Sequence, residues 1–257
     1  AHYNLGNTLK ELGEHQKAMS SYEKAIQINP NHVDAHNNLG LAFYALGEHQ
    51  KAISSYEKAI QIQPNYAGAH NNLGLAFYAL GEHQKAMSSY ERAIQIQPNY
   101  AGAHNNLGIV LNELGEYQKA MSSYERAIQI QPNYAAAHYN LGNTLKELGE
   151  HQKAMSSYER AIQIQPNYAD AHNNLGIVLN ELGEYQKAMS SYERAIQIQP
   201  NYAAAHNNLG NTLNELGEHQ KAISSYKKAI QIEPDNLTSH WLSMNIFPVI
   251  YKNLKEI

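Results

Sequence analysis

The sequence predicts an all-α fold: an α-solenoid in which seven helical hairpins form a right-handed superhelix, closed by a C-terminal capping helix. Two observations lead to this prediction. A segment of 34 residues is repeated along the chain, and the apolar residues of each copy follow the period of a helix. The repeat is marked by seven prolines at intervals of 34 residues: Pro30, Pro64, Pro98, Pro132, Pro166, Pro200 and Pro234.

The repeat Val33–Tyr66 illustrates the predicted hairpin, and its residues define repeat positions 1 to 34. Residues 35–46 place apolar side chains at i, i+4, i+7, i+8 and i+11, which is one face of a helix. Gly47 suits the left-handed conformation that ends many helices. A second helix is expected over residues 49–61, and Pro64 should end it, because proline lacks a backbone donor and clashes with the preceding turn.

Another glycine lies inside the first helix of every repeat, at position 8, where it is Gly40 in the second repeat. Glycine within a helix costs roughly 1 kcal/mol relative to alanine. Positions 20 and 27 hold alanine, so we expect the paired helices to approach closely along these small residues. This interpretation gives the glycines a structural role.

Seven positions of the repeat carry a resemblance to a known family. Positions 7, 8, 11, 20, 24, 27 and 32 are occupied by Leu39, Gly40, Phe43, Ala52, Tyr56, Ala59 and Pro64. This pattern resembles that of the tetratricopeptide repeat (TPR) family, and it returns in register over residues 1–236. One steady departure is histidine at position 4, where the family often has tryptophan.

We expect residues 1–236 to form seven tandem 34-residue repeats, the first of them truncated at its start. Residues 237–257 do not follow the repeat pattern and are interpreted as an atypical capping helix followed by a lead-in to an absent domain. Terminal repeats are typically atypical, because they cover the apolar end of the stack. The chain is therefore interpreted as a fragment of a longer protein. The apolar residues expected in the capping helix are Leu237, Trp241, Leu242, Ile246 and Phe247.

The composition argues against several classes of partner. With 19 Lys and Arg against 23 Asp and Glu, the charge is close to balanced, so we expect no binding to nucleic acid or to a membrane. No apolar run approaches the ~20 residues of a membrane span, and no signal peptide is visible. The chain has no cysteine, which is compatible with a reducing compartment, and we expect a cytoplasmic location.

Catalysis usually requires unique residues that converge on one pocket, whereas nearly every polar residue here is repeated. We therefore expect no enzymatic activity in this chain and no cofactor. The 14 histidines fall mainly at positions 4 and 17. Equivalent side chains on packed helices lie about 8–10 Å apart, too far to share one metal ion, so no metal site is expected.

The first helix of each repeat has a second face, formed by positions 2, 5, 6, 9, 12 and 13, and in TPR proteins this face lines a concave groove. Asparagine can pair with both the N–H and the C=O of a passing peptide. We therefore predict an asparagine-lined peptide-binding groove, with family consensus at position 6 as the alternative interpretation. Position 6 holds Asn4, Asn38, Asn72, Asn106, Asn140, Asn174 and Asn208, and position 5 adds Asn37, Asn71, Asn105, Asn173 and Asn207.

Other positions of the same face vary between repeats. Leu41, Tyr44, Leu75 and Tyr78 are expected to form an apolar patch for a ligand side chain. Asp34 and Asp170, at position 2, are also assigned to the groove. Several repeats carry glutamate at position 13, which favours basic or neutral ligands.

The sequence thus predicts a protein–protein interaction scaffold whose partner is an extended peptide or protein segment. The stack is also expected to be capable of end-to-end self-association. A closer resemblance, to the TPR arm of O-linked N-acetylglucosamine transferase and SPINDLY-like proteins, implies an alternative: a substrate-recruiting arm whose catalytic domain is missing. That resemblance rests on the run A-H-x-N-L-G-N-x-L-K-E at residues 1–11 and on the asparagine ladder.

Overall fold

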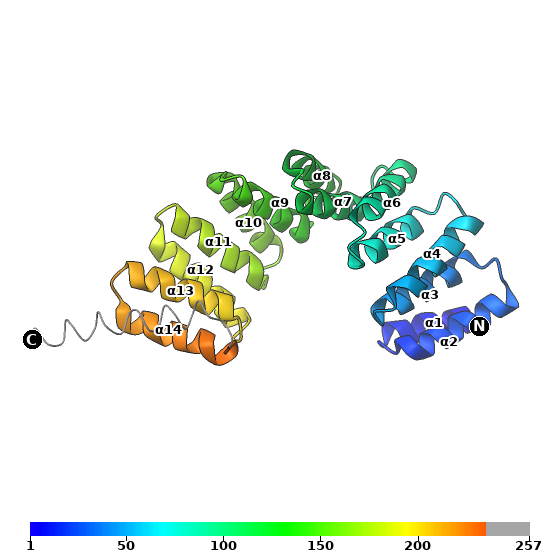
Figure 1. Ribbon diagram of the computed structural model, residues 1–257, viewed down its shortest axis with the longest axis horizontal. Coiled ribbons are helices and arrows are strands. Elements are labelled where there is room, and N and C mark those ends of the chain that lie inside the picture. The colour runs from blue at the N-terminus through cyan, green and yellow to red at the C-terminus, as the bar shows by residue number, and fades with distance from the viewer. Residues whose placement is uncertain (235–257) are drawn as a thin grey trace, which may run out of the picture. The chain divides into compact units, whose positions relative to one another are not determined.

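A computed structural model describes residues 1–234, and this part of the chain is all-α, with fourteen helices and no strand (Figure 1). The predicted capping helix and lead-in, residues 237–257, lie outside the described residues. The chain divides into two compact units, which we call the N-terminal unit (Ala1–Pro132) and the C-terminal unit (from Asn133). None of the described helices is both long enough and apolar enough to cross a membrane.

Each repeat contributes two antiparallel helices, and within each unit every helix packs against the next along the chain. The N-terminal unit contains α1 (His2–Glu11), α2 (His15–Ile28), α3 (Val33–Ala45), α4 (His49–Ile62), α5 (Ala67–Ala79), α6 (His83–Ile96), α7 (Ala101–Glu113) and α8 (Tyr117–Ile130). The C-terminal unit contains α9 (Ala135–Glu147), α10 (His151–Ile164), α11 (Ala169–Glu181), α12 (Tyr185–Ile198), α13 (Ala203–Glu215) and α14 (His219–Ile232). The prediction of an all-α solenoid of hairpins is confirmed.

The turn inside each hairpin is set by the glycine at position 15. Gly47 has a φ of +76°, a conformation that L-residues with a Cβ rarely adopt. The following backbone N–H, that of Glu48, donates to the carbonyl of Phe43 at 2.9 Å. This bond gives a partner to one of the carbonyl groups at the C-terminal end of α3. This closure brings α4 back along α3.

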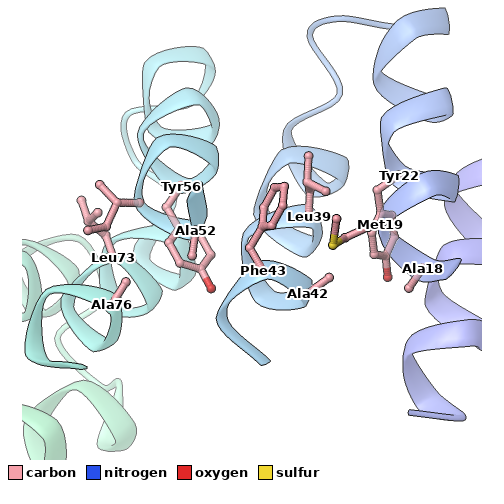
Figure 2. Packing of buried hydrophobic residues seen from close by; sticks show 11 residues of the cluster. Ala18, Met19, Tyr22, Leu39, Ala42, Phe43, Ala52, Tyr56, Leu73 and Ala76 are labelled. Atoms are coloured by element: carbon pink, nitrogen blue, oxygen red, sulfur yellow. The ribbon is translucent and has the colours of Figure 1, made fainter. Parts of the chain in front are cut away.

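Buried residues from α2, α3, α4 and α5 meet in a single cluster, in which Met19 and Tyr22 lie toward Leu39 and Phe43 (Figure 2). The tyrosine at position 24 is the largest fully buried side chain of each repeat; Tyr22, for example, is 0% exposed. Apolar burial stabilises the fold by about 25 cal/mol per Å² removed from water. This cluster therefore joins the first three hairpins, and a second cluster, formed by Ala86, Tyr90 and Val110, follows it in the same unit.

The glycine at position 8 accommodates that tyrosine. A Cβ at Gly40 would lie 2.5 Å from Cε1 of Tyr56, closer than any real contact between carbon atoms. The sequence interpretation, that glycine lets the helices touch along small residues, was therefore incomplete: the nearest neighbour is an aromatic ring. The glycine is structural, as predicted, but it makes room for the edge of a phenol.

Candidate functional site

The asparagines at positions 5 and 6 form a relay of side-chain hydrogen bonds through the N-terminal unit. Within α5, the Nδ2 of Asn71 donates to Oδ1 of Asn72 at 3.5 Å. Between repeats, Asn106 donates to Asn71 at 3.1 Å, and Asn72 donates to Asn37 at 3.0 Å. Each amide thus accepts from one neighbour and donates to another, and the relay links the first helices of successive hairpins.

The relay ends differently at the first hairpin, where position 5 is Tyr3. Asn38 donates to Oδ1 of Asn7 at 2.9 Å and to the hydroxyl of Tyr3 at 3.3 Å. The C-terminal unit repeats this arrangement, because Asn174 donates to Asn143 at 2.9 Å and to Tyr139 at 3.2 Å. There, too, an inter-repeat bond of 3.0 Å joins Asn208 to Asn173.

Burial separates the predicted groove residues into two kinds. The position-5 asparagines Asn37, Asn71, Asn105 and Asn173 are buried, each 4–6% exposed. Because they are buried, they support the face from beneath. The position-6 asparagines are half-buried, except Asn4, which is exposed at the first helix, and Asn140 is half-buried like the rest.

Counting donors distinguishes the position-6 residues further. An amide nitrogen carries two N–H donors, and its oxygen accepts two bonds. Asn72, Asn106 and Asn208 each donate one bond between repeats, which leaves one N–H for another partner. Asn38 and Asn174 spend both donors, on a tyrosine and an asparagine, so each can offer only its oxygen.

The predicted apolar patch is partly committed to the fold. Leu41 and Tyr44 pack against the cluster of Figure 2, and Leu75 and Tyr78 pack against the next cluster along the N-terminal unit. The hydroxyl of Tyr78 donates to the carboxylate of Glu113. Burial, together with this carboxylate, raises the pKa of Tyr78 to about 12. All four side chains are half-buried, so each leaves only part of its apolar surface exposed to a ligand.

The aspartates at position 2 are exposed, and each accepts a hydrogen bond from the tyrosine at position 34 of its own repeat. The hydroxyl of Tyr66 donates to Asp34 at 3.2 Å, and that of Tyr202 donates to Asp170 at 2.7 Å. These aspartates therefore face an aromatic side chain from the next helix start.

Sequence reasoning missed the asparagines at position 9. Asn143 accepts from the buried Tyr158 at 2.8 Å as well as from Asn174, and Asn7 does the same for Tyr22 and Asn38. A signal was available: position 9 is asparagine in both repeats that have tyrosine at position 5. The seventh repeat also has asparagine at position 9, where Asn211 accepts from Tyr226 at 2.8 Å, although its position 5 is Asn207, so this asparagine is not confined to the repeats with tyrosine at position 5.

The position-4 histidines form hydrogen bonds with the linker that precedes their helix. His36 Nε2 lies 2.9 Å from the carbonyl oxygen of Pro30, and His172 Nε2 lies 3.0 Å from that of Pro166. In residues 1–234 no group of three or more His, Asp or Glu side chains is placed to hold a metal ion. The position-4 histidines therefore join their helix to the proline that ends the preceding repeat.

A hollow of about 620 Å³ lies on the surface between α12 and α14. Its lining includes Ile196, His206, Leu209 and Ser225, and a similar hollow of about 390 Å³ is lined by Ile94, His104, Leu107 and Ser123. These are furrows between successive second helices, and neither is lined by a position-5 or position-6 asparagine.

A protein-family model described as TPR repeat matches residues 6–47, 40–81, 110–149 and 142–183, which together cover more than half of the chain. The chain belongs to the tetratricopeptide repeat family. Further models described as tetratricopeptide repeat match residues 67–100, 89–121 and 167–234, so TPR matches run through nearly all the described residues.

Solved structures agree with this assignment. The TPR chain is 28% identical to MamA, covering 65% of this chain and 97% of that one with a TM-score of 0.59. It resembles in fold YrrB, described as a TPR protein with an unusual peptide-binding site (24% identity, 75% and 99% coverage, TM-score 0.62). PilF of Pseudomonas aeruginosa shares the fold as well (22% identity, 83% and 97% coverage, TM-score 0.75). No curated protein matched the sequence.

Proposed function

We propose that this TPR chain is a protein-interaction scaffold that binds an extended polypeptide along the face of its first helices. The observation that carries the proposal is the donor left over at Asn72, Asn106 and Asn208. Each of these amides also has acceptor capacity on its oxygen, so it can pair with the N–H and the C=O of a peptide backbone. The peptide-binding site ascribed to the fold neighbour YrrB is consistent with this function.

The spacing of the repeats suits a strand-like ligand. Neighbouring helices pack about 8–10 Å apart, and an extended peptide advances about 3.3 Å per residue. Each repeat therefore matches roughly three ligand residues. Since the contacts go to the backbone, affinity should depend on ligand length more than on ligand sequence.

The test is a fluorescence titration of an uncharged, extended twelve-residue peptide against the wild-type chain and the double variant Asn72→Ala/Asn106→Ala. Two or more lost hydrogen bonds, each worth about 0.5–1.5 kcal/mol, should weaken binding by about 1–3 kcal/mol, or at least fivefold. Asn65→Ala, in an exposed linker, is the matched control and should bind as wild type does. Equal affinity of the double variant, with its helicity intact, would refute backbone capture by these amides.

The alternative, a substrate-recruiting arm of an O-GlcNAc transferase or SPINDLY-like glycosyltransferase, draws its support from the sequence resemblance alone. It would use the same face and the same backbone contacts, so the titration above does not separate the two functions. Because the alternative rests on the resemblance alone, we propose the scaffold as the function of this chain.

A further inference from the structure

The first and fifth repeats differ from the others at position 5, where Tyr3 and Tyr139 stand in place of asparagine. Four of the asparagines at this position are buried, at 4–6% exposed, whereas both tyrosines are half-buried. A phenol is longer than a carboxamide, and its hydroxyl group reaches the level of the position-6 amides. The hydroxyl oxygen of Tyr139 lies 3.2 Å from Nδ2 of Asn174, in the first helix of the next repeat.

Each of these hydroxyl groups accepts a hydrogen bond from the position-6 asparagine of the next repeat. Asn174 donates to Tyr139 at 3.2 Å, and Asn38 donates to Tyr3 at 3.3 Å. A tyrosine hydroxyl group carries one hydrogen of its own, so it can donate as well as accept. Since the asparagine supplies the hydrogen of these bonds, the hydrogen of each hydroxyl group is left for another acceptor.

The amide oxygen at position 9 cannot take that hydrogen. Oδ1 of Asn143 accepts from Tyr158 at 2.8 Å and from Asn174 at 2.9 Å, which uses both of its lone pairs. In the part of the chain that the structure describes, the hydroxyl hydrogen of Tyr139 therefore has no acceptor. The first repeat has the same arrangement around Oδ1 of Asn7, which also accepts two bonds.

The hydroxyl group of Tyr139 is a donor that is held in place. Burial raises the pKa of this phenol, so the group keeps its proton at neutral pH. The ring packs against that of Tyr168, with their centroids 4.8 Å apart and their planes tilted by 37°. Because the ring is already ordered, little side-chain entropy is lost when the hydroxyl group binds an acceptor.

We propose that the hydroxyl group of Tyr139 donates a hydrogen bond to a backbone carbonyl of the bound polypeptide, in place of the N–H groups that Asn174 has used within the fold. This inference rests on the proposed function and adds a binding residue to it. Oδ1 of Asn174 accepts one bond, from Asn173 at 3.1 Å, and keeps a lone pair for a peptide N–H. At this repeat two residues share the work of one amide: a phenol donates and an asparagine accepts. Tyr3 and Asn38 form a second copy of the pair.

The experiment uses the full chain labelled with ¹³C-tyrosine and the uncharged twelve-residue peptide of the titration above. The ring signals of Tyr168, which is present in every variant, report by NMR the binding of the peptide beside Tyr139. The variants are Tyr139→Phe, Asn174→Ala and the two combined. The control is Tyr185→Phe, which removes a half-buried hydroxyl group from the start of the outer helix α12.

The combined variant is needed because Tyr139→Phe alone returns an N–H to Asn174, and that N–H can replace the lost donor. In the Asn174→Ala chain no such replacement exists, so Tyr139→Phe should weaken binding there by about two- to tenfold, the equivalent of one hydrogen bond. The same substitution should weaken binding less in the wild type. The Cζ signal of Tyr139 should also move when the peptide binds, whereas the Cζ signal and the affinity tested at Tyr185 should not change.

Equal affinities of Asn174→Ala with and without Tyr139→Phe would overturn the inference. Binding of the peptide without any change in the signals of Tyr139 and Tyr168 would overturn it as well. In both cases a loss of affinity in Asn72→Ala/Asn106→Ala would still support backbone capture by the other amides. If the wild type binds the peptide in neither measurement, the proposed function fails, and this inference fails with it.

Discussion

The asparagine relay makes a prediction about stability that can be tested apart from any ligand. Asn71 is 6% exposed, accepts a 3.1 Å bond from Asn106 in the next repeat, and donates a weaker bond of 3.5 Å to Asn72. A hydrogen bond contributes about 0.5–1.5 kcal/mol net, and one of 3.5 Å contributes at the low end. Asn71→Ala should therefore destabilise the N-terminal unit by about 1–2 kcal/mol.

Repeat arrays unfold with limited cooperativity, so the assay should be local. Native-state hydrogen exchange of the amides in α5 and α7, combined with urea unfolding, reports the loss where it occurs. A double-mutant cycle of Asn71→Ala with Asn106→Ala should give a coupling energy of about 0.5–1.5 kcal/mol. Ser88→Ala, which breaks only a bond within α6, is the control and should stay within about 0.5 kcal/mol of wild type. A coupling energy near zero would show that the relay does not join the repeats.

Two further predictions concern the core and the linkers. Gly108→Ala places a Cβ 2.5 Å from the ring of Tyr124, whereas Gly102→Ala in the same helix places one 3.3 Å from the edge of Tyr100. The first variant should therefore be about 1–3 kcal/mol less stable than the second. Equal melting temperatures of the two variants would contradict the ring contact. Burial lowers the pKa of His172 in the folded chain, so the histidine of the unfolded chain takes up a proton at a higher pH. The contribution of His172 to the free energy of unfolding should be complete above about pH 6.5 and should decline as the pH falls through the folded pKa. The melting temperature should be lower at pH 5 than at pH 7.5, and the difference should shrink in His172→Gln.

The sequence was sufficient for the fold because its local signals agree with one another. The expected helix over residues 35–46 is observed at Val33–Ala45, and the one over residues 49–61 at His49–Ile62, an error of no more than two residues at either end. Gly47 and the proline period supplied those ends. A helical pattern shows only which face is apolar. It could not show that the ring of Tyr56 lies against Gly40, because that neighbour is set by how two helices pack.

The candidate site was predicted less completely, and for a related reason. Sequence reasoning placed Asn71 and Asn72 together on an open face, yet Asn71 is only 6% exposed, whereas Asn72 is half-buried. Asn71 accepts its inter-repeat hydrogen bond from Asn106, 35 residues away in another hairpin, and no local pattern predicts that pairing. The missing information is the register between neighbouring hairpins.

That register also determines what the unusual residues of the first and fifth repeats contact. A tyrosine at position 5 has no amide with which to continue the relay, and Asn7 and Asn143 at position 9 supply the acceptor in its place. The relay is kept, and the phenols of Tyr3 and Tyr139 are released to stack on the residue at position 34, beside the aspartate at position 2. The exchange changes the acceptors that close the relay, and it leaves the position-6 asparagines Asn38 and Asn174 with both N–H donors used. Which position-6 amide keeps an N–H is therefore decided by the residues at positions 5 and 9 of the preceding repeat, and not by the repeat in which that amide stands.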